Sequence, residues 1–321
     1  MFVGHAALAF AVVAGLAARR VERRQALLVG LVAAAFAAIP DVDMLYAPVG
    51  LVGARLDALA MASAFWSTST VVHRGVTHSL VVAFLVGCVA LLWFVGTRRR
   101  HSSRGTGALV GSLGLGTALV VGVGLDTGAL GGAVTALFVA SAVGVAWATA
   151  RRTDLGVRPV AVAAAFGLLS HPFGDVFTGT PPAFLYPFDV VLVSERVTLA
   201  GDPTLHLLAA GALELLTIWF ALSVLVDGSE LSVRDLIAPR VAVAVGYAVS
   251  VFLIPPPTLD LSYPFVLSVV SVGAIGVIPH LHLRKSRRRR VSVPSRTTAF
   301  VTALAAVTVA WGAYAVAYLV V

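Results

Sequence analysis

Charged residues and cysteine are both scarce in this sequence. Asp, Glu, Lys and Arg make up only 12% of the 321 residues, whereas 59% of the residues are hydrophobic. Soluble domains contain about 25% charged residues, and a soluble fold of this length could not bury so much apolar surface. The single cysteine, Cys88, excludes a disulfide framework and a cysteine-based metal site. The composition therefore predicts an integral membrane protein.

Apolar runs recur along the whole chain, and about ten of them approach the roughly 20 residues that a helix needs to cross a bilayer core. They lie at residues 2–18, 25–40, 79–97, 106–125, 128–150, 160–171, 205–226, 236–254, 262–282 and 297–320. Only Leu125 to Gly128 separate the fourth run from the fifth, and we expect a tight hairpin there. The runs lack the alternation of barrel strands, so helices must satisfy their backbone groups. We predict an all-α, polytopic transmembrane helix bundle of about ten spans that forms one integral membrane domain over residues 1–321.

Lysine and arginine fall almost entirely on one predicted side of the membrane. Basic bursts follow the first, third, fifth and ninth runs, the last of them at 284–290, and two arginines flank the loop after the seventh run. Of the 23 basic residues, only Arg55, Arg74 and Arg196 fall on the opposite side. The positive-inside rule makes the side with the bursts cytoplasmic. Both termini are therefore expected to be extracytoplasmic in a multi-pass protein of the cell membrane.

Histidines and aspartates gather at the other predicted boundary, although they are spread widely along the sequence. They stand at the outer ends of the first, second, third and sixth runs: His5; Asp41 and Asp43; His73, Arg74 and His78; His171 and Asp175. Ionisable residues at a membrane segment are functional by default. Their convergence predicts a site on the extracytoplasmic face.

The residue types at this boundary are typical of a metal site. Imidazole and carboxylate groups bind divalent metals such as zinc, and no thiolate is available. His171 and Asp175 are four residues apart and face one side if a helix continues through them. His73 and His78 are five apart, so a turn at Gly75 must bring them together. The candidates exceed the three protein ligands of a mononuclear catalytic zinc, which makes two ions plausible: His5, Asp41, Asp43, His73, His78, His171 and Asp175.

Each motif also has a purely structural interpretation. The Pro-Asp-x-Asp stretch at 40–43 is typical of a turn or a helix cap, and Thr77 or Ser79 is placed to cap the run that follows. Asp202 and His206 favour a capping and interface role at the start of the seventh run. The convergence of the other motifs on one boundary favours the metal site.

The order of the motifs resembles that of a known family. Gly4-His5, Pro40-Asp41-x-Asp43, His73-Arg74-Gly75-x-Thr77-His78-Ser79 and Leu169-Ser170-His171-x3-Asp175 look like the motifs of the YdjM-type membrane-bound metal-dependent hydrolases. That family is similar in turn to the zinc-dependent phospholipase C and nuclease group. The motifs cover roughly residues 1–190, and residues 191–321 carry helices of unassigned role. The resemblance implies hydrolase activity and metal ligation by Asp41, Asp43, His73, His78, His171 and Asp175.

A hydrolytic site would need a proton acceptor and a group that binds the substrate. A carboxylate not fully engaged by metal, Asp43 or Asp175, is expected to accept the proton of the attacking water. Arg74 is one of few cations on this side. A planar guanidinium suits an anionic oxygen, so we assign it to a phosphate group, with a carboxylate partner or an interface anchor as the alternatives. A site at headgroup level favours a membrane lipid or a lipid-linked phosphoester as substrate.

A transporter or channel is the main alternative, in which the aspartates and histidines form a proton or cation relay. Such proteins distribute charges through the depth of the bilayer and often repeat their halves. Here the charges stop at one boundary and no repeat is evident, with Glu214 inside the seventh run as the exception. No nucleic-acid-binding motif appears.

Overall fold

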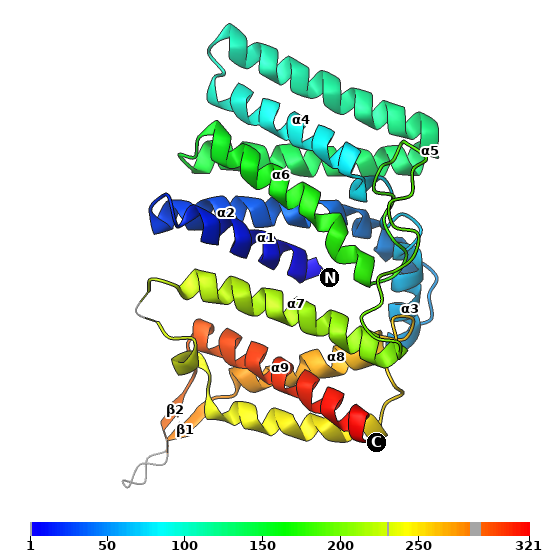
Figure 1. Ribbon diagram of the computed structural model, residues 1–321, viewed down its shortest axis with the longest axis vertical. Coiled ribbons are helices and arrows are strands. Elements are labelled where there is room, and N and C mark those ends of the chain that lie inside the picture. The colour runs from blue at the N-terminus through cyan, green and yellow to red at the C-terminus, as the bar shows by residue number, and fades with distance from the viewer. Residues whose placement is uncertain (1, 230, 283–289) are drawn as a thin grey trace. The chain divides into compact units, whose positions relative to one another are not determined.

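The computed structural model describes residues 2–229, 231–282 and 290–321, most of which are helical (Figure 1). The basic stretch at 284–290 lies outside the described residues, apart from Arg290.

The chain divides into two compact units. Unit 1 comprises Met1–Val197 and Leu216–Leu225, and unit 2 comprises Thr198–Leu215 and Val226–Val321. The motifs within residues 1–190 all fall in unit 1. Its elements, with η marking 3₁₀ helices, are α1 (Phe2–Ala17), α2 (Arg23–Ala38), η1 (Pro40–Leu51), α3 (Ala58–Ser69), η2 (Val76–His78), α4 (Leu80–Arg98), α5 (Ser103–Arg152), α6 (Val157–Gly174) and η3 (Asp175–Phe177).

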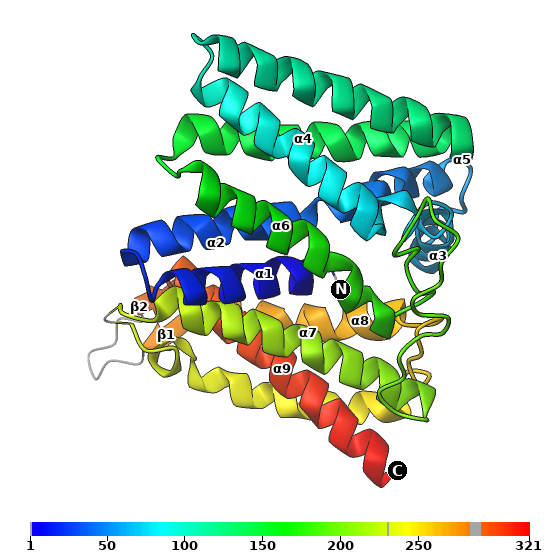
Figure 2. The same ribbon diagram turned by 45° about the horizontal axis from the view of Figure 1, so that its top comes forward.

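Helices α1, α2 and α6 lie side by side (Figures 1 and 2). A Cβ atom on Gly30 of α2 would lie 2.6 Å from the Cβ atom of Ala14 in α1. A Cβ atom on Gly167 of α6 would lie 2.5 Å from the Ala33 carbonyl oxygen in α2. Small residues at helix crossings allow this close approach in membrane proteins. The three helices are therefore held tightly against one another.

Helix α5 reverses its direction at Gly128. The backbone there has φ 84° and ψ 180°, a conformation that favours glycine. Figure 1 shows the two limbs running antiparallel, with α4 beside them. A Cβ atom on Gly124 would lie 3.5 Å from the Cα atom of Gly132, so the limbs touch on either side of the turn. The hairpin predicted between the fourth and fifth apolar runs is confirmed.

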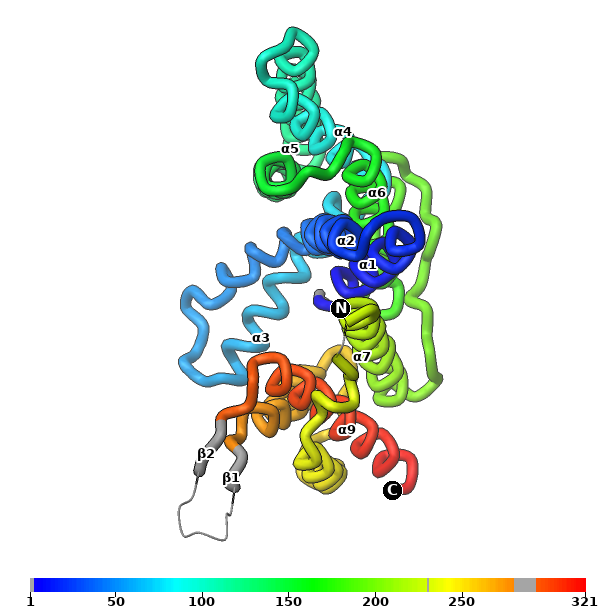
Figure 3. Tube along the Cα trace, turned by 90° about the vertical axis from the view of Figure 1, so that its left-hand side faces the viewer, coloured from blue at the N-terminus to red at the C-terminus, as the bar shows by residue number. Residues whose placement is uncertain are grey.

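Elements η1 and α3 form a helical hairpin between α2 and α4 (Figure 3). Helix η1 follows α2 after a bend of 45°, and Pro40 begins it, where the missing N–H of proline leaves no bond unmade. Gly50 packs so closely on α3 that a Cβ atom would clash with Thr68 Oγ1. The hairpin brings the end of α3 back to the start of η1, so that Asp41 lies near His73.

Unit 2 is also mainly helical. Its core includes Phe265 and Tyr314, whose ring centroids are 4.7 Å apart, and Trp311 Nε1 donates to the Leu208 carbonyl oxygen at 2.9 Å. One antiparallel strand pair, with His280 opposite Ser292, is the exception to the all-α prediction. The elements from here to the C-terminus, of which α7 belongs partly to unit 1, are α7 (Pro203–Val226), η4 (Arg234–Leu236), η5 (Pro239–Phe252), α8 (Tyr263–Ser271), η6 (Val272–Val277), β1 (His280–His282), β2 (Arg290–Ser292) and α9 (Arg296–Val320).

Among the described residues, five helices are long and apolar enough to cross a membrane, or six if α2 and η1 together form one bent span. The prediction of an all-helical membrane protein agrees with this, but about ten spans and extracytoplasmic termini are not confirmed. Helix α5 enters the count of five once, although its two antiparallel limbs correspond to two of the predicted runs. In addition, α1 with 16 residues and η5 with 14 are shorter than the roughly 20 residues of a full span.

Candidate metal centre

Four donor atoms converge where η1, η2, α6 and η3 meet. His78 Nε2 lies 3.1 Å from His171 Nε2 and 3.0 Å from Asp175 Oδ2. Asp41 Oδ1 lies 3.4 Å from His171 Nε2 and 3.8 Å from His78 Nε2, and His171 Nε2 is 3.8 Å from Asp175 Oδ2. Ligands of a tetrahedral zinc stand about 3.3 Å apart, because zinc binds nitrogen and oxygen at about 2.0–2.1 Å. The separations therefore fit a metal site.

Hydrogen bonds on the far sides of the imidazole rings determine where their protons lie. His171 Nδ1 is 2.7 Å from the Ala37 carbonyl oxygen, which can only accept, so this Nδ1 carries the proton. Thr77 Oγ1 donates its single proton to Asp43 Oδ2 at 2.7 Å. It must then accept from His78 Nδ1, 2.9 Å away. In their neutral forms, both rings would present an unprotonated Nε2 to each other.

Two unprotonated nitrogens 3.1 Å apart repel each other unless a positive charge lies between them. Burial lowers the pKa of His78, which disfavours an imidazolium at that ring. Asp175 Oδ2 is buried beside them and receives no hydrogen bond within the described part of the chain. This donor set of nitrogen and oxygen suits a divalent cation.

A second set of ligands overlaps the first at Asp175. His5 Nε2 lies 3.2 Å from Asp175 Oδ1, and the His5 ring is 3.9 Å from that of His171. Asp175 thus directs Oδ1 to His5 and Oδ2 to His78, as a carboxylate shared by two ions would. Ligand atoms lie within 4.8 Å of one another in each of two groups: Asp41, His73, His78 and Asp175; His5, His171 and Asp175.

Asp43 supports the histidines from behind. Its Oδ1 accepts from His73 Nδ1 at 3.0 Å. Its Oδ2 accepts from Thr77 and lies 3.5 Å from His78 Nδ1. Carboxylates that orient metal-binding histidines in this way raise the metal affinity of a site.

Burial and charge both bear on what the centre can hold. Among the candidate ligands, Asp41 and His73 have the most exposed side chains, at 11% and 13%, so the open edge of the centre lies there. The three aspartates and the guanidinium of Arg74 leave two negative charges. Such charges are costly to bury unpaired, and one divalent cation balances them.

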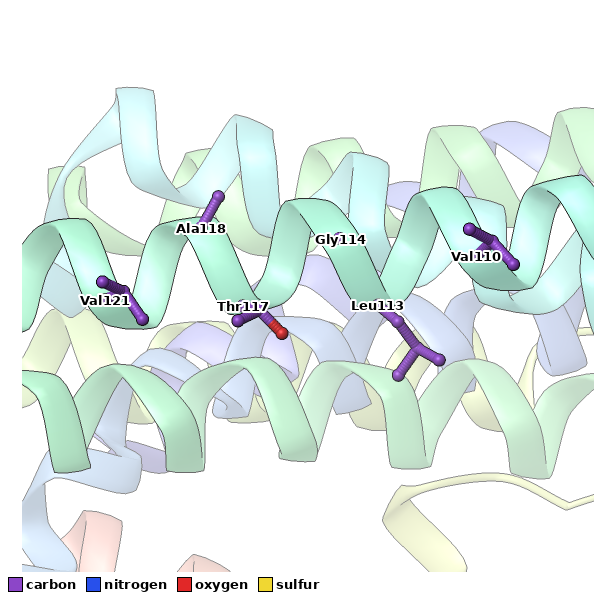
Figure 4. Close-up of a pocket in the computed structure, with 6 residues that line it drawn as sticks. All are labelled: Val110, Leu113, Gly114, Thr117, Ala118 and Val121. Carbon is purple, nitrogen blue, oxygen red and sulfur yellow. The ribbon is translucent and has the colours of Figure 1, made fainter.

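Two surface pockets differ in their relation to the centre. A groove of about 600 Å³ runs along the first limb of α5 (Figure 4). It has no ionisable group, since its lining is Val110, Leu113, Gly114, Thr117, Ala118 and Val121. A pocket of about 480 Å³ is lined by Arg74 and the loop at 180–194. Because Arg74 Nη2 is 3.5 Å from Asp175 Oδ1, this second pocket borders the centre.

The structure brings all the predicted site residues together. His171 and Asp175 share a face, because α6 continues to Gly174. The rings of His73 and His78 are 5.0 Å apart, and the turn between them runs through Arg74, with φ 69°, and Gly75, with φ −82° and ψ −126°. The residues are His5, Asp41, Asp43, His73, Arg74, His78, His171 and Asp175.

Two groups in the centre escaped the sequence analysis. Of the two caps considered for α4, Ser79 is the one that accepts from helix N–H groups. Thr77 instead links Asp43 to His78, and its place inside the His-Arg-Gly-x-Thr-His motif is the signal that could have identified it. Ala37 contributes a backbone carbonyl, which no side-chain pattern reveals.

The remaining ionisable candidates lie in unit 2. Asp202 caps α7 by accepting from the Leu205 N–H at 2.8 Å, and His206 Nδ1 accepts from the Leu199 N–H at 3.0 Å. The capping role expected of Asp202 is confirmed. Among the residues that the structure describes, Asp202, His206 and Glu214 belong to neither ligand group.

Comparison with known proteins identifies the family of this chain. No curated protein and no solved structure matches this chain. The model of the family described as YdjM inner membrane protein matches residues 1–254, so the chain belongs to the YdjM inner membrane protein family.

Proposed function

We propose that this protein is a membrane-bound metal-dependent hydrolase that cleaves a phosphoester or a lipid-linked substrate at the extracytoplasmic boundary of the membrane. The supporting observation is the pair of Nε2 atoms on His78 and His171, which lie 3.1 Å apart beside Asp41 and Asp175. We infer a divalent metal, zinc in the first place, with room for a second ion near His5.

The residues of the centre divide into ligands and a proton acceptor. His78, His171, Asp41 and Asp175 hold the first ion. A bound metal supplies Lewis acidity, which activates a water molecule and polarises a phosphoryl or acyl oxygen.

Proton acceptance falls to the pair formed by Asp43 and His73. His73 Nδ1 lies 3.0 Å from Asp43 Oδ1, and the ring reaches the open edge of the centre. His73 Nε2 can then take a proton from water while Asp43 stabilises the resulting imidazolium. The proton acceptance expected of Asp43 would thus operate through His73.

The surroundings of the centre favour an amphiphilic substrate. The pocket beside Arg74 is lined by the loop at 180–194, where Phe188, Val191 and Leu192 are exposed. Apolar surface of this kind at a membrane boundary suits the tail of a lipid-linked compound. A phosphoester headgroup would lie toward the metal ligands.

Hydrolysis assays on the purified protein in lipid nanodiscs test the proposal. We expect metal-dependent release of phosphate or a headgroup from membrane phosphoesters, loss of this activity on chelation, and recovery with Zn²⁺. The variants His78→Ala and His171→Ala should be inactive. His101→Ala is the matched control, because His101 is exposed and belongs to neither ligand group. Activity that survives chelation or the His78→Ala substitution would refute the metal-dependent mechanism.

The relay alternative predicts a different result for the same purified protein. A transporter or channel would move protons or cations across sealed liposomes and show no hydrolysis. Ion flux that depends on His78 and His171, without product formation, would replace the hydrolase proposal.

A further inference from the structure

Arg74 holds an unusual backbone conformation. Among the described residues it alone combines a side chain with a positive φ, at 69°. Side chains are sterically unfavourable in this left-handed region, and such conformations persist where surrounding contacts over-determine them. Arg74 follows His73 directly, so the contacts that hold it bear on the metal centre.

The guanidinium of Arg74 is directed at one short segment that begins with Asp175. Nη1 donates to the carbonyl oxygens of Asp175 and Thr180, at 3.1 and 3.0 Å. Nη2 donates to Thr178 Oγ1 at 2.7 Å and lies 3.5 Å from Asp175 Oδ1. The Arg74 carbonyl oxygen accepts from the Ala183 N–H at 3.4 Å. Arg74 therefore ties the turn between His73 and His78 to the segment that carries Asp175.

These contacts leave little of the guanidinium for a substrate. The four N–H groups on Nη1 and Nη2 face acceptors of the protein itself. The remaining donor, Nε, is buried and makes no hydrogen bond within the described part of the chain. A phosphate group would have to displace bonds that already exist.

Gly179 provides the room that this arrangement needs. It has φ 69°, a conformation that favours glycine. A Cβ atom there would lie 2.8 Å from Arg74 Nη1. Any other residue at this position would push the guanidinium away from Asp175 and Thr180.

We propose that Arg74 is a positioning residue that fixes the orientation of Asp175. Its Nη2 and His5 Nε2 both face Asp175 Oδ1, which leaves Oδ2 turned toward His78. Loss of the Arg74 contacts frees the Asp175 carboxylate to rotate, which weakens metal binding. This inference rests on the metal centre of the proposed function, but it assigns Arg74 to a carboxylate of the protein in place of a substrate phosphate.

Cobalt titration of the full-length protein in detergent tests this role. Co²⁺ affinity and the visible absorption spectrum are measured for the wild type and for Arg74→Gln, Arg74→Lys and Gly179→Ala. We expect Arg74→Gln to lower the affinity about 10–100-fold, the range for residues that support metal ligands, and to shift the absorption bands. Lysine keeps the charge but lacks the planar fork, so Arg74→Lys should fall between Arg74→Gln and the wild type.

Arg55→Gln is the matched control. Arg55 is one of the few other cations on the same predicted side, its side chain is 88% exposed, and it pairs with Asp57 at 3.8 Å. Its Co²⁺ affinity and spectrum should equal those of the wild type. The same result in Arg74→Gln would overturn the proposal. If Arg74→Gln fails to fold, Gly179→Ala decides, because it retains the guanidinium and an unchanged spectrum there contradicts the role.

Hydrogen exchange separates this inference from the proposed hydrolase. Faster amide exchange at residues 175–180 in Arg74→Gln than in the wild type supports the positioning role of Arg74 even if the protein hydrolyses nothing. Unchanged exchange in this segment overturns it, whatever the outcome of activity assays.

Discussion

At the residue scale, the imidazoles of His73, His78 and His171 are each held from behind by a group that can accept an Nδ1 proton. The Ala37 carbonyl holds His171, Thr77 holds His78, and Asp43 holds His73. This second layer directs the unprotonated Nε2 atoms inward. Metal affinity should therefore depend on groups that never touch the ion.

Removal of the second layer should weaken metal binding without removing a ligand. We expect Asp43→Asn and Thr77→Val to lower Zn²⁺ affinity about 10–100-fold. Thr77→Val removes the group that orients His78, and Asp43→Asn changes the acceptor of His73. Competition with a chelating dye measures the affinity. The exposed Asp154 supplies the control Asp154→Asn, which should behave as the wild type. Wild-type affinity in both test variants would mean that the layer does not orient the histidines.

Acidification should release the metal, since only neutral histidine binds it. Burial lowers the pKa of His78 below its ordinary value of about 6.5. The lowered pKa keeps the ring neutral to more acidic pH, so binding is complete at neutral pH and is lost as the pH falls below about 6.5. Metal content after dialysis at a series of pH values measures this. Loss of half the bound metal at a pH above 7 would contradict this expectation.

At the element scale, the centre depends on close packing of α1, α2 and α6. Helix α1 carries His5, the last turn of α2 supplies the Ala37 carbonyl, and α6 carries His171. Gly30 and Gly167 let these helices touch. A shift of α6 against α2 would break the bond from His171 Nδ1 to Ala37.

Gly167→Ala should destabilise the protein and its metal site together. The added Cβ atom would lie 2.5 Å from the Ala33 carbonyl oxygen, and overpacking of this kind costs about 1–3 kcal/mol. We expect a lower Tm and weaker Zn²⁺ binding. Gly107→Ala is the control in another helix, because nothing lies within 4 Å of the added atom. Equal Tm values for the two variants would argue against a tight crossing of α2 and α6.

At the scale of the whole molecule, the sequence could predict which ligands meet but not how they are held. Span parity and the basic loops placed His5 and Asp175 at one boundary although 170 positions separate them. The φ of Arg74 and the hydrogen bond of Thr77 depend on tertiary contacts, which leave no periodic pattern. The number of spans is not confirmed, because hydropathy does not distinguish a full span from a short apolar helix such as α1.

The basic loops predict a membrane sidedness that can be measured on intact cells. In a Cys88→Ser background, we expect Arg196→Cys to react with a membrane-impermeant thiol reagent and Arg152→Cys to react only after lysis. Both positions are exposed. The positive-inside rule is the reason for this expectation. The reverse labelling pattern would place the centre on the cytoplasmic side.

Metal analysis of the purified full-length protein tests the central claim most directly. The account predicts one or two equivalents of a divalent metal per chain, bound through nitrogen and oxygen alone. It also predicts that His171→Ala and Asp41→Asn lose metal, while His101→Ala keeps it. A wild-type protein that retains no divalent metal, or variants that retain as much as the wild type, would contradict the account.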